Sequence, residues 1–171
     1  LWAVQTPQVF EAGLIKADTK KALALMSAAF FGEPARQDIQ VIGITGTKGK
    51  TSSAYMVRAI LEAAGHKAGV IGTVGVLIGE KLTQIENTTP QSYDVQKYLR
   101  EMADAGCEYC VMEASSIGLR DSRVYGIPFK VGVFTNFSED HIGGVEHKDM
   151  QEYLESKALL FPMCEAAVGN F

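Results

Sequence analysis

The sequence lacks several features that mark specialised classes of protein. Its 171 residues include three cysteines, an odd number that argues against a disulfide framework. Basic residues are not in excess: the formal net charge is -4, so composition gives no reason to expect nucleic acid or an anionic membrane as a partner. No apolar run approaches the ~20 residues of a membrane helix, and residues 1–20 lack the basic start and long apolar core of a signal peptide. The cytoplasm is therefore the expected location.

Two of the cysteines, Cys107 and Cys110, form a C-x-x-C pair in "CEYCVMEA". Such a pair can be redox-active or can bind metal, but no second Cys or His pair completes a zinc site. The run that contains it is typical of a buried strand. We therefore expect two buried thiols without a function of their own.

The chain does contain a regular alternation of strand-length apolar runs and helical patterns. Hydrophobic residues make up 47% and charged residues 21%, the balance of a globular protein with a core. Helices are expected at 20–31, 50–64, from Thr89 as N-cap to Gly106, and at 148–161. Strands are expected at 39–44, 66–79, 108–114 and 129–136, and 32–38 as a linker. This alternation predicts βαβ units and an α/β fold with a mostly parallel, doubly wound sheet.

The segment "TGTKGKTSSAYM" at 45–56 follows the apolar run "VIGI" and opens a helical pattern. A strand that breaks into a glycine-rich turn before a helix directs backbone N–H groups and the positive helix end at one spot, which suits phosphate. Lys50 would reach the terminal phosphates, and the Thr51 hydroxyl would ligate Mg²⁺. The general pattern G-x-x-x-x-G-K-[ST] would have glycine where this chain has Ile44. A glycine turn without a ligand is the alternative.

Polar side chains follow two further apolar runs. Glu113 ends the run "YCVME", and Asp140 and His141 lie in "TNFSEDHIG" after the fourth strand. Because ligands of an open parallel sheet lie outside the carboxyl ends of its strands, these residues should face the same crevice as the phosphate loop. A carboxylate there can hold Mg²⁺. The alternatives are a strand-end glutamate that reaches water and an Asp-His pair that caps a helix or fills a turn.

Lys157 is a charged residue at an apolar position. The last expected helix has a buried stripe at helical spacing, formed by Met150, Tyr153, Leu154 and Phe161. Lys157 falls within this stripe. An uncompensated buried ammonium is costly, so the group would bind a counter-charge, lose its proton or be modified. The alternative is a lysine at the edge of the stripe whose stem lies on apolar surface while its head reaches water.

Several segments, taken together, resemble one enzyme family. They are "GTKGKT" (46–51), "NTTP" (87–90), "MEASSIGL" (112–119), "TNFSEDHIG" (135–143) and "YLESKALLF" (153–161). In this order and spacing they resemble the Mur ligases, and among these the branch that adds the third residue of the peptidoglycan stem. The resemblance spans roughly residues 17–170. The alternative enzyme is a ligase of the same superfamily such as folylpolyglutamate synthetase, against which the second and third segments argue.

The resemblance implies a division of the chain. Residues 38–171 would be a partial ATP-binding central domain of the P-loop type, and residues 17–37 the end of the preceding domain with its linker. Residues 1–16, "LWAVQTPQVFEAGLIK", instead resemble a segment of methylerythritol-phosphate cytidylyltransferases. We expect this segment to be a foreign or fused piece without activity of its own.

The resemblance also implies a reaction. With ATP and Mg²⁺, the family forms an acyl phosphate on the carboxylate of UDP-MurNAc-L-Ala-D-Glu, and the amine of diaminopimelate or lysine then attacks it. The chain would be an incomplete central domain of such a ligase. The alternative to an active ligase is a fragment that binds nucleotide without turning it over, because the chain would be incomplete.

The family's site residues match positions of this chain. ATP would be bound by Gly46, Thr47, Lys48, Gly49, Lys50, Thr51 and Ser52. Catalysis and metal binding would involve Lys50, Thr51, Glu113, His141 and Lys157, the last of them carbamylated by CO₂ to an anion near the second Mg²⁺. The muramoyl dipeptide would be held by Thr88, Thr89, Ser116 and Arg123. Three positions depart from the residues more common in close relatives (Val, His and Gln): Ala114, Ile117 and Asp121.

Overall fold

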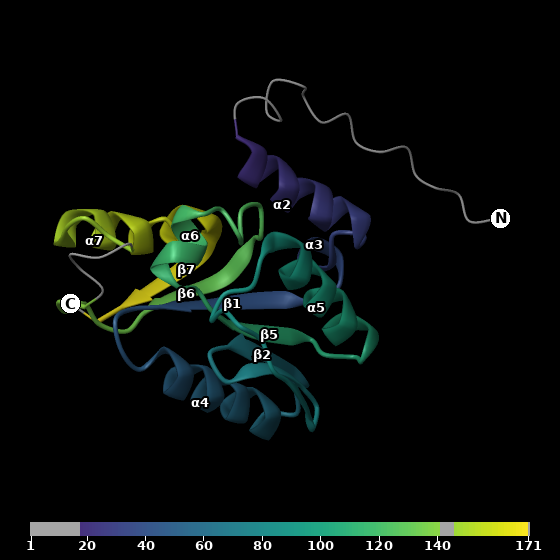
Figure 1. Ribbon diagram of the computed structural model, residues 1–171. Helices are drawn as coiled ribbons and strands as arrows, with labels where there is room; N and C mark the ends of the chain where they lie inside the picture. The colour runs from purple at the N-terminus through teal and green to yellow at the C-terminus, as the bar shows by residue number, and fades with distance from the viewer. Residues whose placement is uncertain (1–17, 141–145, 171) are drawn as a thin grey trace.

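The parallel sheet predicted from the sequence is present. The computed structural model describes residues 18–140 and 146–170, and within these ranges seven strands form one sheet in the order β4-β3-β2-β5-β1-β6-β7 (Figure 1). The strands are β1 Gln40–Thr45, β2 Ala68–Gly72, β3 Gly75–Ile78, β4 Lys81–Thr83, β5 Tyr109–Glu113, β6 Phe129–Phe134 and β7 Cys164–Gly169. The neighbours from β2 to β7 run parallel, whereas β3 and β4 are added antiparallel at one edge.

Helices cover both faces of this sheet. They are α2 Thr19–Phe30, α3 Pro34–Gln37, α4 Lys50–Ala63, α5 Ser92–Asp104, α6 Ser116–Arg120 and α7 Met150–Ala158. α4 lies on one face, and α5, α6 and α7 lie on the other (Figure 1). The buried apolar side chains divide in the same way, because successive residues of a strand point to opposite faces. Val41 of β1 belongs to the cluster that contains Leu99 of α5, and Ile42 belongs to the cluster that contains Ala54 of α4. The doubly wound α/β fold is confirmed.

Some elements differ from the sequence-based expectation. Residues 66–79 form the hairpin of β2 and β3 rather than one strand, and Gly75, with a φ of 135°, takes part in the reversal. The expected linker at 32–38 contains the short helix α3, which Pro34 opens at a position where proline is favoured. The sequence patterns indicated neither α6 nor β7. In α6, Ser115 is the N-cap and accepts a hydrogen bond from the Gly118 N–H.

Helix α5 begins at Ser92, three residues after the expected N-cap. Gln91 occupies the N-cap position and makes no side-chain capping bond. The Thr89 hydroxyl instead donates to the carbonyl oxygen of Glu113 at 2.8 Å. The prediction of Thr89 as a helix cap is therefore wrong, because its hydroxyl fastens this loop to the end of β5.

Helix α7 buries a face centred on Tyr153 and Lys157, each of which is 1% exposed. The face continues through Ser156 and Leu160, which are also buried. Leu154 is 38% exposed, so its expected place in the buried stripe is wrong. The helix ends at Ala158, short of the expected end, and the 3₁₀ turn Phe161–Met163 then leads into β7.

The C-x-x-C pair is buried, as expected. Cys107 and Cys110 are free thiols, and burial raises the pKa of each. Both therefore stay protonated at neutral pH and are poor nucleophiles. Among the described helices, none is both long enough and apolar enough to cross a bilayer.

Candidate active site

The loop between β1 and α4 has the geometry of an anion site. Gly46 has a φ of 141° and Gly49 a φ of 81°. A Cβ at position 46 would lie 2.0 Å from Thr135 Oγ1, so no larger residue fits there. The first N–H groups of α4, from Gly49 to Ser52, have no acceptor within the helix, so the helix leaves them for an external acceptor such as phosphate.

The end of β6 holds this loop in place. Asn136 accepts from the Thr47 N–H through its carbonyl at 3.0 Å and from the Lys48 N–H through its side chain at 2.9 Å. Its amide nitrogen and the Thr135 hydroxyl both donate to the carbonyl of Lys48, at 2.9 and 2.8 Å. Thr47 and Lys48 were expected to bind ATP, but their N–H groups are used within the protein. The N–H groups at 49–52 are the better candidates for phosphate.

Lys50 is folded back over the loop. Its Nζ donates to the carbonyl of Gly46 at 2.8 Å and to that of Thr47 at 3.0 Å. Burial lowers the pKa of this lysine, and the charges of Glu113 and Asp140 oppose the shift. The ammonium thus lies against the glycine loop, and its contact with the terminal phosphates stays a prediction.

Glu113 is 1% exposed, which contradicts the alternative of a strand-end glutamate in water. Its carboxylate accepts from the Thr51 hydroxyl at 3.1 Å, from the Thr73 N–H at 3.0 Å and from the Thr73 hydroxyl at 3.3 Å. Gly72 makes room for it, since a Cβ there would lie 2.1 Å from Glu113 Oε1. The structure therefore brings the expected Mg²⁺ ligands Thr51 and Glu113 together, with Thr73 as an additional partner.

Lys157 is buried beside the same loop. Its Nζ donates to the carbonyl of Gly46 at 2.8 Å and lies 4.2 Å from the centre of the Tyr153 ring. Burial, and then the charge of Lys50, lower the pKa of Lys157 to about 7. The alternative of a lysine head that reaches water is wrong, because the whole side chain is enclosed.

This pKa predicts a pH-dependent stability. A free lysine titrates near 10.5, so between pH 7 and 10.5 the unfolded chain binds a proton that the folded chain has lost, and stability rises with pH across this window. Below pH 7 the full cost of the buried ammonium is present. We expect Lys157→Met to raise the thermal midpoint most at pH 6 and progressively less toward pH 10, measured in CO₂-free buffer without nucleotide. An equal effect at both pH values would contradict the assignment.

The loop that was expected to carry a metal ligand is only partly described. His141 lies outside the described residues. Asp140 is described, and its charge raises the pKa of both Lys50 and Lys157 against the effect of their burial. Asp140 is therefore close enough to the ammonium groups of Lys50 and Lys157 to interact with both.

A cavity of about 240 Å³ joins the phosphate loop to the residues expected to hold substrate. It is lined by Lys50, Asn87, Thr88, Ser115, Ser116, Ile117, Arg123, Glu146, Tyr153 and Lys157. Three of these side chains are basic and one is acidic. The cavity thus suits an anionic ligand.

The residues expected to hold the muramoyl dipeptide take different places around this cavity. Thr88, Ser116 and Arg123 line it. Thr89 is fully buried, and its hydroxyl also accepts from the Ser115 N–H at 2.9 Å, so its side chain acts as a support. Arg123 is held by a bond to the Thr89 carbonyl at 2.9 Å and by Asp121 at 3.6 Å.

Asp121, which departs from the family pattern, is not an uncompensated charge. Lys20 of α2 pairs with it at 2.7 Å, and this contact, with the nearby arginines, lowers the pKa of its carboxyl group. The negative charge of Asp121 is therefore shared between Lys20 and Arg123.

Some site residues carry no functional signal in the sequence pattern. Thr73 lies in a hairpin turn, Asn136 follows a strand, and Tyr153 has the spacing of an ordinary core residue. His147, whose ring nitrogen lies 2.8 Å from the Ser116 hydroxyl, precedes a helix without any periodic pattern. Only the three-dimensional arrangement brings these residues to the cavity and the loop.

Comparison with known proteins agrees with this geometry. Residues 44–170 match the model of the Mur ligase middle domain. A UDP-N-acetylmuramoyl-L-alanyl-D-glutamate--2,6-diaminopimelate ligase of Clostridium botulinum is 46% identical over 153 residues, which are 90% of this chain and 31% of that protein. A ligase of the same name from Geobacter metallireducens is 44% identical over 150 residues, covering 88% of this chain and 29% of that protein. The chain thus spans about a third of the length of these relatives.

Solved structures of two kinds of ligase have a similar fold. A structure of a ligase of that name superposes with a TM-score of 0.76 at 28% identity, covering 88% of this chain and 31% of that one. A Mycobacterium tuberculosis folylpolyglutamate synthase complexed with ADP and AMPPCP gives a TM-score of 0.67 at 20% identity, over 86% of this chain and 40% of that one, a likeness of fold alone. Because the middle-domain model matches most of the chain, the protein belongs to the Mur ligase family.

Proposed function

We propose that the chain supplies the ATP-binding part of a ligase that joins 2,6-diaminopimelate to UDP-MurNAc-L-Ala-D-Glu. The observation that carries the proposal is the convergence of the phosphate loop, Glu113 and Lys157 beside one cavity lined by three basic side chains. The name of the two ligases described above supports diaminopimelate, rather than lysine, as the amine. The cytoplasm remains the proposed location.

The start of α4 fits Mg²⁺. Thr51 Oγ1 and Glu113 Oε2 lie 3.1 Å apart, so a hydroxyl and a carboxylate, the hard oxygen ligands that Mg²⁺ prefers, can hold one ion together. When bound, Mg²⁺ would neutralise charge on the transferred phosphoryl group. His141 and Lys157 stay predictions as ligands of a second ion.

The chain's own groups then have distinct roles. The N–H groups at 49–52 and the Lys50 ammonium would bind the ATP phosphates and stabilise the charge that spreads over the phosphoryl group in transfer. Thr88, Ser116 and Arg123 would hold the muramoyl dipeptide in the cavity, with its carboxylate toward the phosphate loop. The carboxylate oxygen would take the phosphoryl group to give an acyl phosphate, and the amine would displace phosphate from it.

We also propose that Lys157 is carbamylated in the active enzyme. The Nζ lone pair would bond to the carbon of CO₂, and the nitrogen would release one proton, which leaves an anionic carbamate. A pKa of about 7 supports this step, because a large share of the amine is unprotonated at neutral pH. The change from cation to anion would also turn the repulsion between Lys157 and Lys50 into attraction.

The function is tested by measuring ligation with the complete protein that contains this chain. We expect ATP-dependent addition of diaminopimelate to UDP-MurNAc-L-Ala-D-Glu, and calorimetric binding of this nucleotide substrate but not of folate. Lysine, offered at the same concentration, is the control for the choice of amine. Binding of folate, or ATP turnover stimulated by a folate and glutamate, would overturn the proposal in favour of a folylpolyglutamate synthase.

Residues 1–171 alone are expected to bind ATP weakly, with Mg²⁺, and not to turn it over. The relatives are about three times longer, so this polypeptide would not hold all reactants in attack geometry, from which much of a rate enhancement comes. The outer strand β7 is mostly exposed, so self-association is also expected. The measurements are calorimetry with ATP and a phosphate-release assay with the muramoyl dipeptide and diaminopimelate. Release at an ordinary enzyme rate would contradict this prediction.

A further inference from the structure

His147 is a buried polar residue that the proposed reaction does not yet use. It lies in the loop before α7 and is 1% exposed. Its Nε2 is 2.8 Å from Ser116 Oγ, and its ring packs on Tyr153 with the centroids 4.9 Å apart. In the part of the chain that the structure describes, its Nδ1 has no hydrogen-bond partner. Apolar packing alone does not account for a buried imidazole that bonds to a serine of the cavity wall.

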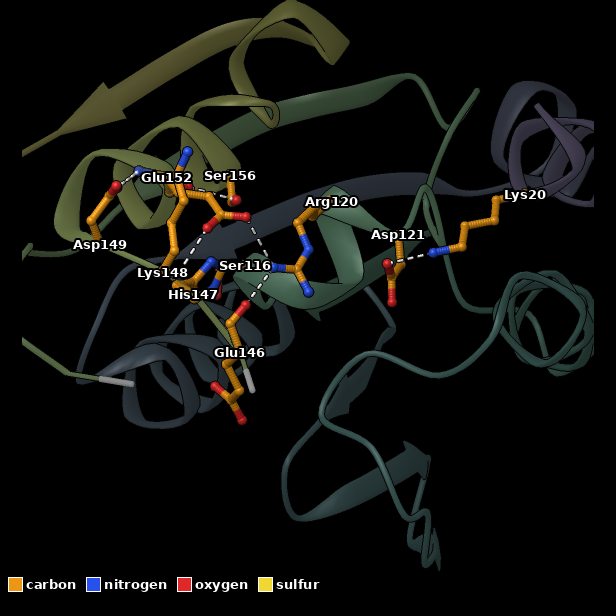
Figure 2. A network of polar contacts seen from close by, with 10 residues as sticks. All are labelled: Lys20, Ser116, Arg120, Asp121, Glu146, His147, Lys148, Asp149, Glu152 and Ser156. Carbon is orange, nitrogen blue, oxygen red and sulfur yellow. Dashed lines mark hydrogen bonds and ion pairs between the residues drawn. The ribbon is translucent and has the colours of Figure 1, made fainter. Parts of the chain in front are cut away.

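The chain on both sides of His147 is tied to α6, the helix that begins with this serine (Figure 2). Arg120 of α6 donates to the carbonyl of Glu146 and pairs with Glu152 of α7 at 3.3 Å. The Glu152 carboxylate also accepts from the Lys148 N–H at 2.9 Å. The network therefore anchors the backbone on both sides of His147 to α6, the helix that begins with Ser116.

The protonation of the ring follows from its surroundings. Burial, and then the charge of Arg120, lower the pKa of His147, so the neutral form is present at neutral pH. A neutral imidazole donates from one nitrogen and accepts at the other. We assign the hydrogen to Nε2 from the network, because this leaves an acceptor rather than an N–H donor unpaired at Nδ1. The Ser116 oxygen then accepts from the ring, and its own hydrogen must point elsewhere.

The hydrogen of the Ser116 hydroxyl can be donated to a ligand in the cavity. Ser116 lines this cavity together with the basic side chains of Lys50 and Arg123, which remain cationic when Lys157 is carbamylated, and with one carboxylate, Glu146. An anionic group bound beside Lys50 and Arg123 needs hydrogen-bond donors. We propose that His147 is a positioning residue that makes the Ser116 hydroxyl a donor to an anionic group of the substrate in this cavity. This inference rests on the proposed function, which supplies the muramoyl dipeptide, with its carboxylates, as that substrate.

The test is steady-state kinetics of the complete protein, with the KM for the muramoyl dipeptide and the KM for ATP measured separately. His147→Phe keeps an aromatic ring against Tyr153 but removes the donor. We expect about a tenfold rise in the KM for the dipeptide, the scale of one hydrogen bond, with the KM for ATP within about twofold of wild type. Ser116→Ala should raise the same KM, and the double variant should add little to it, because the two residues act as one unit.

A conservative pair distinguishes positioning from support of the fold. The amide nitrogen of His147→Gln can reach the place of Nε2, whereas that of His147→Asn can reach only the place of Nδ1. We expect the glutamine variant to keep a lower KM for the dipeptide than the asparagine variant at similar thermal midpoints. This pair decides the question if the phenylalanine variant does not fold.

The outcomes separate the two proposals. A wild-type protein that neither binds nor ligates the muramoyl dipeptide would refute the proposed function. A wild-type protein that does ligate it, with fully additive effects of the His147 and Ser116 substitutions or an unchanged dipeptide KM, would refute the role of His147 alone. A parallel rise in both KM values would also refute that role, since it indicates general loss of structure.

Discussion

Replacement of Lys157 by alanine is expected to lower ligation by the complete protein by roughly 10³-fold, the scale for loss of a group that stabilises developing charge. Short-chain carboxylates such as acetate should partly restore turnover, because they can occupy the space and supply the anion that the carbamate would provide. The buried position of the amine beside the phosphate loop, and its pKa of about 7, are the reasons for this expectation.

The control for this prediction is Lys148→Ala. Lys148 lies just before the same helix, but it is exposed, and its hydrogen bond to Glu152 uses its backbone N–H rather than its side chain. Its replacement should leave turnover near normal. Near-normal turnover of Lys157→Ala would remove the catalytic role of Lys157 and leave a buried amine with only a structural one. Isotope-labelled CO₂, followed by NMR at neutral pH, would test the carbamate directly.

The alternation of strands and helices along the chain could be predicted from the sequence, because it follows from the local spacing of apolar residues. Three segments show this. The strand at 39–44 and the run that ends at Glu113 are continuous apolar stretches of strand length, and the helix after Lys50 has apolar residues at helical spacing. Thr89 shows the limit of this reasoning. Its position before a proline has the local signature of a helix cap, but the contact with Glu113 across 24 positions overrides that signature.

A site residue could be predicted from the sequence only where its residue type is unusual for its position in the pattern. A lysine within an apolar stripe is such a case, and Lys157 is buried in the structure, as its place in the stripe predicted. Thr73 and His147 could not be predicted in this way, because a threonine in a turn and a histidine before a helix are both common. Their importance comes from the neighbours that the fold gives them, the carboxylate of Glu113 and the hydroxyl of Ser116.

Substitution of Glu113 by glutamine is expected to lower Mg²⁺-dependent ligation by about 100-fold or more while the protein stays folded. The glutamine carbonyl oxygen can still accept from the Thr73 N–H, which Glu113 Oε1 accepts at 3.0 Å. Its amide group has nearly the same volume, so the close approach to Gly72 is kept. The substitution removes the negative charge that would compensate Mg²⁺ next to the Thr51 hydroxyl.

Calorimetry with ATP, in the presence and absence of Mg²⁺, measures this effect apart from turnover. In the wild-type protein we expect Mg²⁺ to tighten ATP binding, and in Glu113→Gln we expect most of that gain to be lost, because a neutral amide is a weaker ligand than a carboxylate. Glu108→Gln is the matched control, since Glu108 is an exposed residue just before the same strand and pairs with His66 far from the loop. If Mg²⁺ tightened ATP binding equally in all three proteins, Glu113 would not be a metal ligand, and its burial would be explained by its bonds to Thr51 and Thr73 alone.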